Sequence, residues 1–106
     1  MAQPQFDHFG VPTKMKCEGA TYLEGAGVHF TEPANHPYRV EFLRFEKGSP
    51  MPKEVQKMPH AAFRVDDIEA AVQGKKVVLA PLDVAADMKI AFILDGDALI
   101  ELMQKK

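Results

Sequence analysis

Two histidines and two glutamates stand out because they occupy segments that otherwise favour β-strands. His8 lies in "FDHFGVP" and His60 in "MPHAAFRV", each at the start of one half of the chain. Glu41 in "RVEFLRF" and Glu101 in "LIELMQK" share the pattern apolar, Glu, apolar, apolar. Imidazole nitrogens and carboxylate oxygens form a donor set for divalent first-row metals, so these four residues are the first candidates for chemistry.

The elements that position these residues form a repeated unit. In the first half, β-prone runs and turn residues predict a strand, a polar connector from Thr13 to Ala20 and three strands. In the second half they predict a strand at 60–65, a short helix at 67–74 capped by Asp66 or Asp67, and three strands. The histidines lie 52 positions apart (60 minus 8) and the glutamates 60 apart (101 minus 41). Internal duplication explains both separations.

The glutamates are unusual in their strands because of their neighbours. Side chains alternate along a strand, so Glu41 shares its face with Leu43 and Phe45, and Glu101 lies between Leu99 and Met103 on one face. A carboxylate among apolar side chains is costly to desolvate unless a cation, hydrogen bonds or water compensates it. Each glutamate therefore requires a partner.

The histidine of the second half points away from the predicted helix. His60 shares its face with Ala62 and Arg64, whereas the alternate residues form an apolar face for the helix to cover. If the two halves curl toward each other, both histidines and both glutamates face one concavity. That arrangement suits a divalent metal such as Zn, Mn, Fe, Co or Ni.

Each residue taken alone has a plainer interpretation, which stays open at this point. A single histidine in a strand is more often a hydrogen-bonded core or rim residue than a metal ligand. A strand glutamate usually faces solvent. The metal hypothesis depends on all four residues occurring at equivalent places in two similar halves.

Composition limits the other classes of function. A chain of 106 residues with 46% hydrophobic content can form one domain with one core. The formal charge of −2 is dispersed, which disfavours nucleic acids and anionic membranes as partners. No apolar run approaches the roughly 20 residues that cross a bilayer. Cys17 is the only cysteine and the first residues do not resemble a secretory signal, so we expect a cytoplasmic protein.

The segments "FDHFGVP", "PHAAFRVDDIEAAV" and "KIAFILDGDALIELMQ" resemble the vicinal oxygen chelate superfamily, which includes glyoxalase I, methylmalonyl-CoA epimerase, extradiol dioxygenases and bleomycin resistance proteins. The resemblance implies a single α+β domain over 1–106, in which two paired βαβββ modules form an eight-stranded half-barrel. Module one would span about 1–49, a linker about 50–57, and module two about 58–106. The connector at 13–20 is too short and polar for a full helix, so the first module has a degenerate or missing one.

In that superfamily, metal ligands come from the first and last strands of each module, which match His8, Glu41, His60 and Glu101. The resemblance implies metal-dependent isomerase, epimerase or lyase chemistry on a small carbonyl or vicinal-oxygen compound, with Glu101 or Glu41 moving a proton. A dioxygenase typically uses two histidines and one carboxylate, which would leave one carboxylate surplus. The alternative is a binding or sequestering protein of the same fold without turnover.

Three further expectations concern the surroundings of the site. Arg64 could hold a substrate carboxylate with its planar fork of donors, although it could equally be a solvated edge residue. Met103 is expected in the cavity. The missing helix would leave one sheet face uncovered, and a second subunit could cover it, since dimers are common among proteins of this kind.

Overall fold

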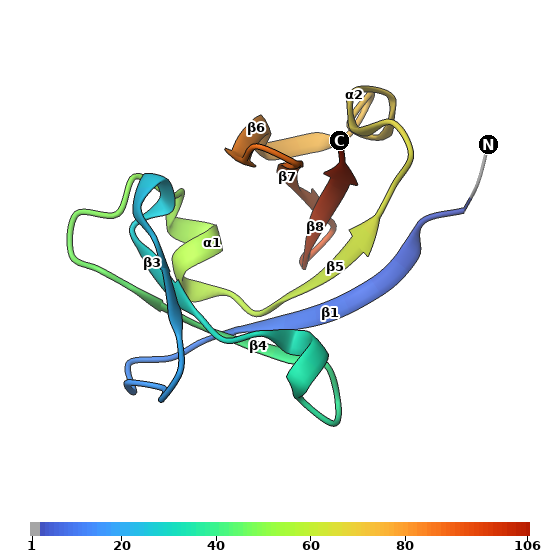
Figure 1. The fold of residues 1–106 in the computed structure, drawn as a ribbon. Helices are drawn as coiled ribbons and strands as arrows, with labels where there is room; N and C mark the ends of the chain where they lie inside the picture. The colour runs from blue at the N-terminus through green and yellow to red at the C-terminus, as the bar shows by residue number, and fades with distance from the viewer. Residues whose placement is uncertain (1–2) are drawn as a thin grey trace.

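The computed structural model describes residues 3–106, which form one curved sheet of eight strands with few helices. The strand order is β2-β3-β4-β1-β5-β8-β7-β6, so each half of the chain supplies one half of the sheet. Figure 1 shows the sheet curling around a central space, with the first half on the left and the second half on the upper right. This α+β half-barrel with two short α-helices is the predicted fold, and it confirms the degenerate first module.

The first half contains four strands and no α-helix between the first two. Residues 13–20 carry no helix, as their polar composition predicted. Single 3₁₀ turns interrupt the hairpin and the following loop. The elements are β1 (Gln5–Pro12), β2 (Thr21–Leu23), η1 (Glu24–Ala26), β3 (Val28–Phe30), η2 (Pro33–Asn35) and β4 (Val40–Phe45).

The second half repeats the pattern with longer strands and one short helix. Asp67 caps that helix by accepting a hydrogen bond from the backbone N–H of Ala70, as predicted. The α-helix ends at Ala71 rather than near Gly74, because a turn with Gly74 at φ +71° takes over the last residues. The elements are β5 (His60–Arg64), α2 (Ile68–Ala71), β6 (Lys76–Ala85), β7 (Met88–Asp95) and β8 (Ala98–Lys105).

Two apolar clusters hold the sheet in its curved shape. On the outer face, Ile68 and Val72 of the α2 region pack on Ala91, Ile93 and Leu102. On the inner face, a second cluster joins both halves of the sheet; its buried members are Ala26, Val28, Leu43, Met51, Val55, Ile90, Phe92 and Leu99. Only the inner cluster spans both halves, so burial of its apolar area holds them together, whereas the outer cluster packs the α2 region on the second half.

The linker between the halves is more ordered than the sequence suggested. It contains a short helix, α1 (Lys53–Lys57), which lies on the inner side of the sheet near β3 (Figure 1). Its one apolar residue, Val55, is buried in the inner cluster. A linker was expected because Gly48, Pro50 and Pro52 close the preceding strand. The helix forms there because Val55 is buried in the cluster that joins both halves.

The two halves join directly through their first strands. Strands β1 and β5 pair antiparallel, with Phe9 opposite Ala61 and Gly10 opposite His60. On either side, β4 pairs parallel with β1, and β8 pairs parallel with β5. The concavity is therefore built within one chain. Neither helix of the described residues is long and apolar enough to cross a membrane.

Aromatic side chains remain exposed where the first module lacks its helix. Phe6 is 42% exposed and Phe9 is 48% exposed, and their rings lie 4.8 Å apart between centroids. The Phe6 ring also meets the edge of Phe63 at 5.8 Å. Solvent-exposed apolar surface of this kind is typical of interaction faces.

Candidate metal centre

The four central strands of the sheet each carry one of the predicted ligands. His8 lies on β1, Glu41 on β4, His60 on β5 and Glu101 on β8. The histidines are only 3% and 5% exposed, and Glu101 is 8% exposed. All four side chains face the concavity, and one donor atom from each lies within 4.8 Å of the others. Residues up to 93 positions apart (101 minus 8) are thus brought to one point.

Cross-strand register explains how four large polar side chains fit at that point. Gly10 lies between Glu41 and His60 on the neighbouring strands. Ala62 lies between His8 and Glu101 in the adjacent row. In each row a small residue separates two large polar side chains, which leaves room for both. A methyl group built on Gly10 would overlap the imidazole ring of His60, so glycine is required there by space rather than by backbone conformation.

The donor atoms approach one another closely but are not well hydrogen-bonded. The His60 Nε2 atom lies 3.1 Å from Glu101 Oε1, and the His8 Nε2 atom lies 3.3 Å from Glu41 Oε1 and 3.5 Å from Glu101 Oε1. Among residues 3–106, no partner satisfies the hydrogen-bond geometry of His8 Nε2 or of either ring nitrogen of His60. Buried polar atoms are nearly always paired, so these nitrogens indicate a missing partner.

The Asp7 carboxylate is hydrogen-bonded to Nδ1, the second ring nitrogen of His8. Its Oδ2 atom lies 2.7 Å from His8 Nδ1. Neighbouring residues on a strand normally point to opposite faces, but the pairing of β1 with β5 shifts register between Phe6 and His8. This bulge brings both side chains to the cavity side, where Asp7 can fix the ring so that Nε2 faces the glutamates. The sequence analysis missed Asp7 because a bulge leaves no signal in the alternation of residues.

The charged groups perturb one another's pKa values. Burial alone would lower the pKa of His8, but its contacts with Glu101, Glu41 and Asp7 outweigh burial and raise that pKa from 6.5 to about 11. Burial raises the pKa of Glu41, with His8 opposing the rise. Burial would also raise the pKa of Glu101, but its contacts with His60 and His8 outweigh burial and hold that pKa below the usual value. Without a metal, the site therefore keeps a proton on His8.

These observations fit a divalent metal ion. The unpaired imidazole nitrogens, the carboxylates aimed at them and the Asp7 support form the donor set and outer support that such ions use. Two donor atoms that share one ion through bonds of about 2.0–2.2 Å can lie at most about 4.4 Å apart. The four donor atoms here lie within 4.8 Å of one another, so small side-chain movements would let them share an ion. The same cation would displace the proton from His8.

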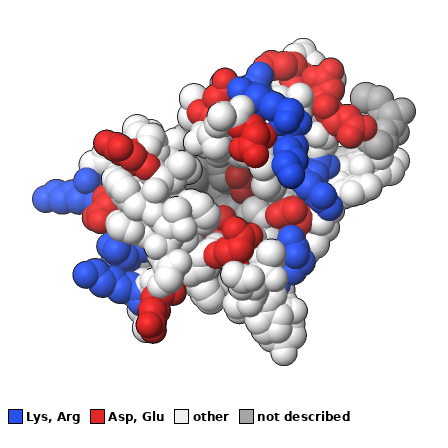
Figure 2. Space-filling view, viewed as in Figure 1, with Lys and Arg blue, Asp and Glu red and all other residues white. Residues whose placement is uncertain are grey.

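The four residues form part of the wall of a cavity of about 340 Å³. Its other walls come from both halves and are mainly apolar, including Phe30, Leu43, Phe92 and Met103. Figure 2 shows the hollow in the middle of the molecule, with acidic residues visible inside it. Met103 thus lies where the sequence suggested, at the wall of the cavity.

Arg64 lies outside the wall of this cavity. Its side chain is 58% exposed, and its Nε atom lies 3.5 Å from Asp7 Oδ1. The Nη2 atom of Arg39 lies 3.6 Å from the same Asp7 Oδ1 atom. The Nε–H group of Arg39 also donates a hydrogen bond to the backbone carbonyl of Asp7. Both arginines therefore surround Asp7.

A larger cavity of about 490 Å³ lies on the outer face beside α2, away from the four residues. It is lined by residues such as Phe63, Val65 and Ile93. Its lining includes none of the four clustered residues, so the candidate metal centre lies in the inner cavity although the outer cavity is larger.

Comparison with solved structures identifies the architecture. The chain is similar to a hypothetical protein of Bacillus halodurans C-125, with a TM-score of 0.69, 24% sequence identity, and coverage of 99% of this chain and 96% of that one. It is also similar to methylmalonyl-CoA epimerase from Mycobacterium tuberculosis, with a TM-score of 0.59, 20% identity, and coverage of 96% and 88%. The chain has the vicinal oxygen chelate fold. No protein-family model and no curated protein matches the sequence.

Proposed function

We propose that the protein is a metal-dependent enzyme of isomerase, epimerase or lyase type that acts on a small carbonyl or vicinal-oxygen compound. The observation that supports this proposal is the buried cluster of His8, Glu41, His60 and Glu101, in which three of the four imidazole nitrogens lack hydrogen-bond partners among residues 3–106. A divalent ion held there (Zn, Mn, Fe, Co or Ni) would supply a Lewis acid for substrate oxygens. Cys17, which is unpaired, accords with a cytoplasmic setting.

The two glutamates have different ion-pair partners, and we assign them different roles on that basis. Glu101 contacts both imidazoles, whereas the ion pairs of residues 3–106 join Glu41 to His8 alone. Glu41 is therefore freer to change position. In the proposed reaction Glu41 takes the proton from the substrate carbon and returns it, while Glu101 keeps both histidines in place.

A second candidate function is the binding of a small apolar molecule without turnover. The apolar walls of the cavity, with Phe30, Phe45 and Phe92 among them, favour it. The buried polar cluster counts against it, because an apolar ligand would cover two carboxylates and two imidazoles without making hydrogen bonds to them.

Part of the proposal is a homodimer. The exposed rings of Phe6 and Phe9 lie on the outer face that the missing helix leaves uncovered, and a second copy of the chain would bury them.

Proton exchange in deuterated water tests the function. The metal-loaded protein is incubated with a panel of small α-hydroxyketones, and loss of the α-proton is followed by NMR. We expect exchange that falls by about 10²–10⁴-fold in Glu41→Gln, which removes the base. Metal content is measured on the same samples, because Glu41 is also a proposed ligand, and the exchange rate per bound metal should fall in Glu41→Gln. No exchange on any compound with metal bound would favour the binding function.

A further inference from the structure

The polar groups of the inner cavity are all acidic or imidazole. Its titratable lining consists of Asp7, His8, Glu32, Glu41, His60 and Glu101. The remaining lining residues are apolar side chains. None of the 13 lysines and arginines, all of which lie within residues 3–106, lines this cavity. A divalent ion would take up the charge of two carboxylates, and the lining itself supplies no lysine or arginine for a further anionic group.

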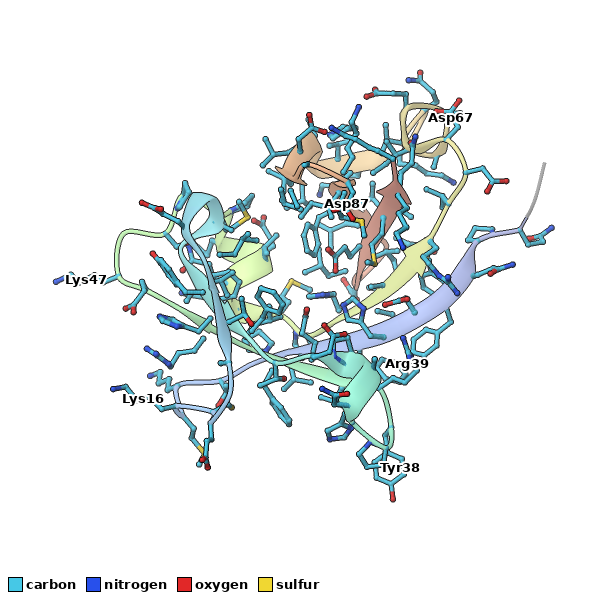
Figure 3. All side chains as sticks on the ribbon, viewed as in Figure 1. Lys16, Tyr38, Arg39, Lys47, Asp67 and Asp87 are labelled. Carbon is cyan, nitrogen blue, oxygen red and sulfur yellow. The ribbon has the colours of Figure 1, made fainter. Side chains whose placement is uncertain are left out.

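Two arginines that contact a lining carboxylate are already engaged in ion pairs. Arg39 and Arg64 both contact the carboxylate of Asp7, which in turn holds His8. An anionic substrate could recruit these arginines only by drawing them away from Asp7. Lys16 and Lys47 project away from the cavity, from the outer surface of the first half (Figure 3). Figure 2 shows basic residues along one side of the hollow and acidic residues within it and at its rim.

The size of the cavity adds a second limit. At about 340 Å³ it lies near the lower end of the roughly 300–1,000 Å³ range of small-molecule sites. It therefore suits a small molecule enclosed by apolar walls.

We propose that the substrates are small, uncharged molecules with two adjacent oxygens and an apolar body, and that compounds with a carboxylate or phosphate on that body are rejected. This inference rests on the proposed function, because the adjacent oxygens are taken to bind at the four-residue site. Rejection follows because an anionic group would lie among apolar side chains and carboxylates with no cation to pair with it.

Two hydroxamic acids provide a matched pair of probes. Hexanohydroxamic acid presents two adjacent oxygens on an apolar chain, and its analogue carries a carboxylate in place of the terminal methyl group. Binding of each is measured by calorimetry on zinc-loaded protein, with zinc content determined on the same sample. We expect the uncharged probe to bind at least about tenfold more tightly, since burying an unpaired carboxylate is costly.

A lysine introduced into the cavity wall should favour the carboxylated probe. Met88 lines the cavity and is partly exposed, so Met88→Lys adds a cation that can pair with the carboxylated probe. Val77→Lys adds the same charge at a position that is 43% exposed and outside the lining, and it should behave as wild type. Selective tightening of the carboxylated probe in Met88→Lys supports the inference.

The outcomes separate the two proposals. Retained zinc with equal binding of both probes, or with binding of neither, overturns the inference and leaves the metal site standing. A protein that retains no zinc overturns the proposed function and the inference with it.

Discussion

Replacing Asp7 with asparagine should weaken metal binding without removing any of the four proposed ligands. Asp7 Oδ2 lies 2.7 Å from His8 Nδ1, so the carboxylate can accept the Nδ1 proton and leave Nε2 free to face Glu41 and Glu101. Asparagine keeps the shape but loses the charge, and charge-assisted hydrogen bonds are roughly twice as strong as neutral ones. Loss of such a supporting carboxylate typically costs about 10–100-fold in metal affinity, or about 1.4–2.8 kcal/mol.

The assay is competition for Zn²⁺ with a chromophoric chelator. Asp97→Asn, in the exposed turn between β7 and β8, is the matched control because it removes the same charge away from the site. Because Arg39 and Arg64 also contact Asp7, thermal unfolding of the metal-free variants is recorded alongside. An affinity within twofold of wild type, or an equal loss in Asp97→Asn, would refute the positioning role of Asp7.

Three further predictions concern space, protons and assembly. Gly10→Ala should displace the His60 ring, which would abolish stoichiometric metal binding and destabilise the fold by about 1–3 kcal/mol. Metal content and denaturant titration measure these two effects. Gly25→Ala is the control, because the space around Gly25 is open and neither effect is expected there. The raised pKa of His8, about 11 against 6.5, contributes stability that is complete below pH 6.5 and is lost as the pH rises toward 11. The unfolding free energy of metal-free protein should therefore fall over that range, and a flat profile would contradict the assigned charge on His8. Light scattering should show a dimer that Phe9→Glu converts to a monomer; a wild-type monomer would count against the proposed assembly.

Alternation and repetition in the sequence predict two similar halves and the faces of their strands, whereas the half-barrel was implied by the resemblance to the vicinal oxygen chelate superfamily. Strand alternation assigned Glu41 and Glu101 to apolar faces, and the duplicated pattern related His8 to His60. The structure brings all four to one point. Their role as metal ligands stays a prediction until the metal is measured.

Features that depend on pairing between distant strands were not visible in the sequence. The place of Gly10 beside His60 follows from the register of β1 against β5, which no local pattern fixes. Asp7 reaches the cavity only because of a bulge. The helix α1 forms because Val55 packs between the halves, so tertiary contacts rather than local propensity determine it.

The central claim is that His8, Glu41, His60 and Glu101 hold one divalent metal ion. The most direct test is elemental mass spectrometry on protein stripped with chelator and re-equilibrated with Zn, Mn, Fe, Co or Ni, beside the His60→Ala and Glu101→Ala double variant. The account predicts close to one equivalent of metal per chain in wild type and loss of that metal in the variant. Wild-type protein that retains no metal, or a variant that retains as much as wild type, would contradict it.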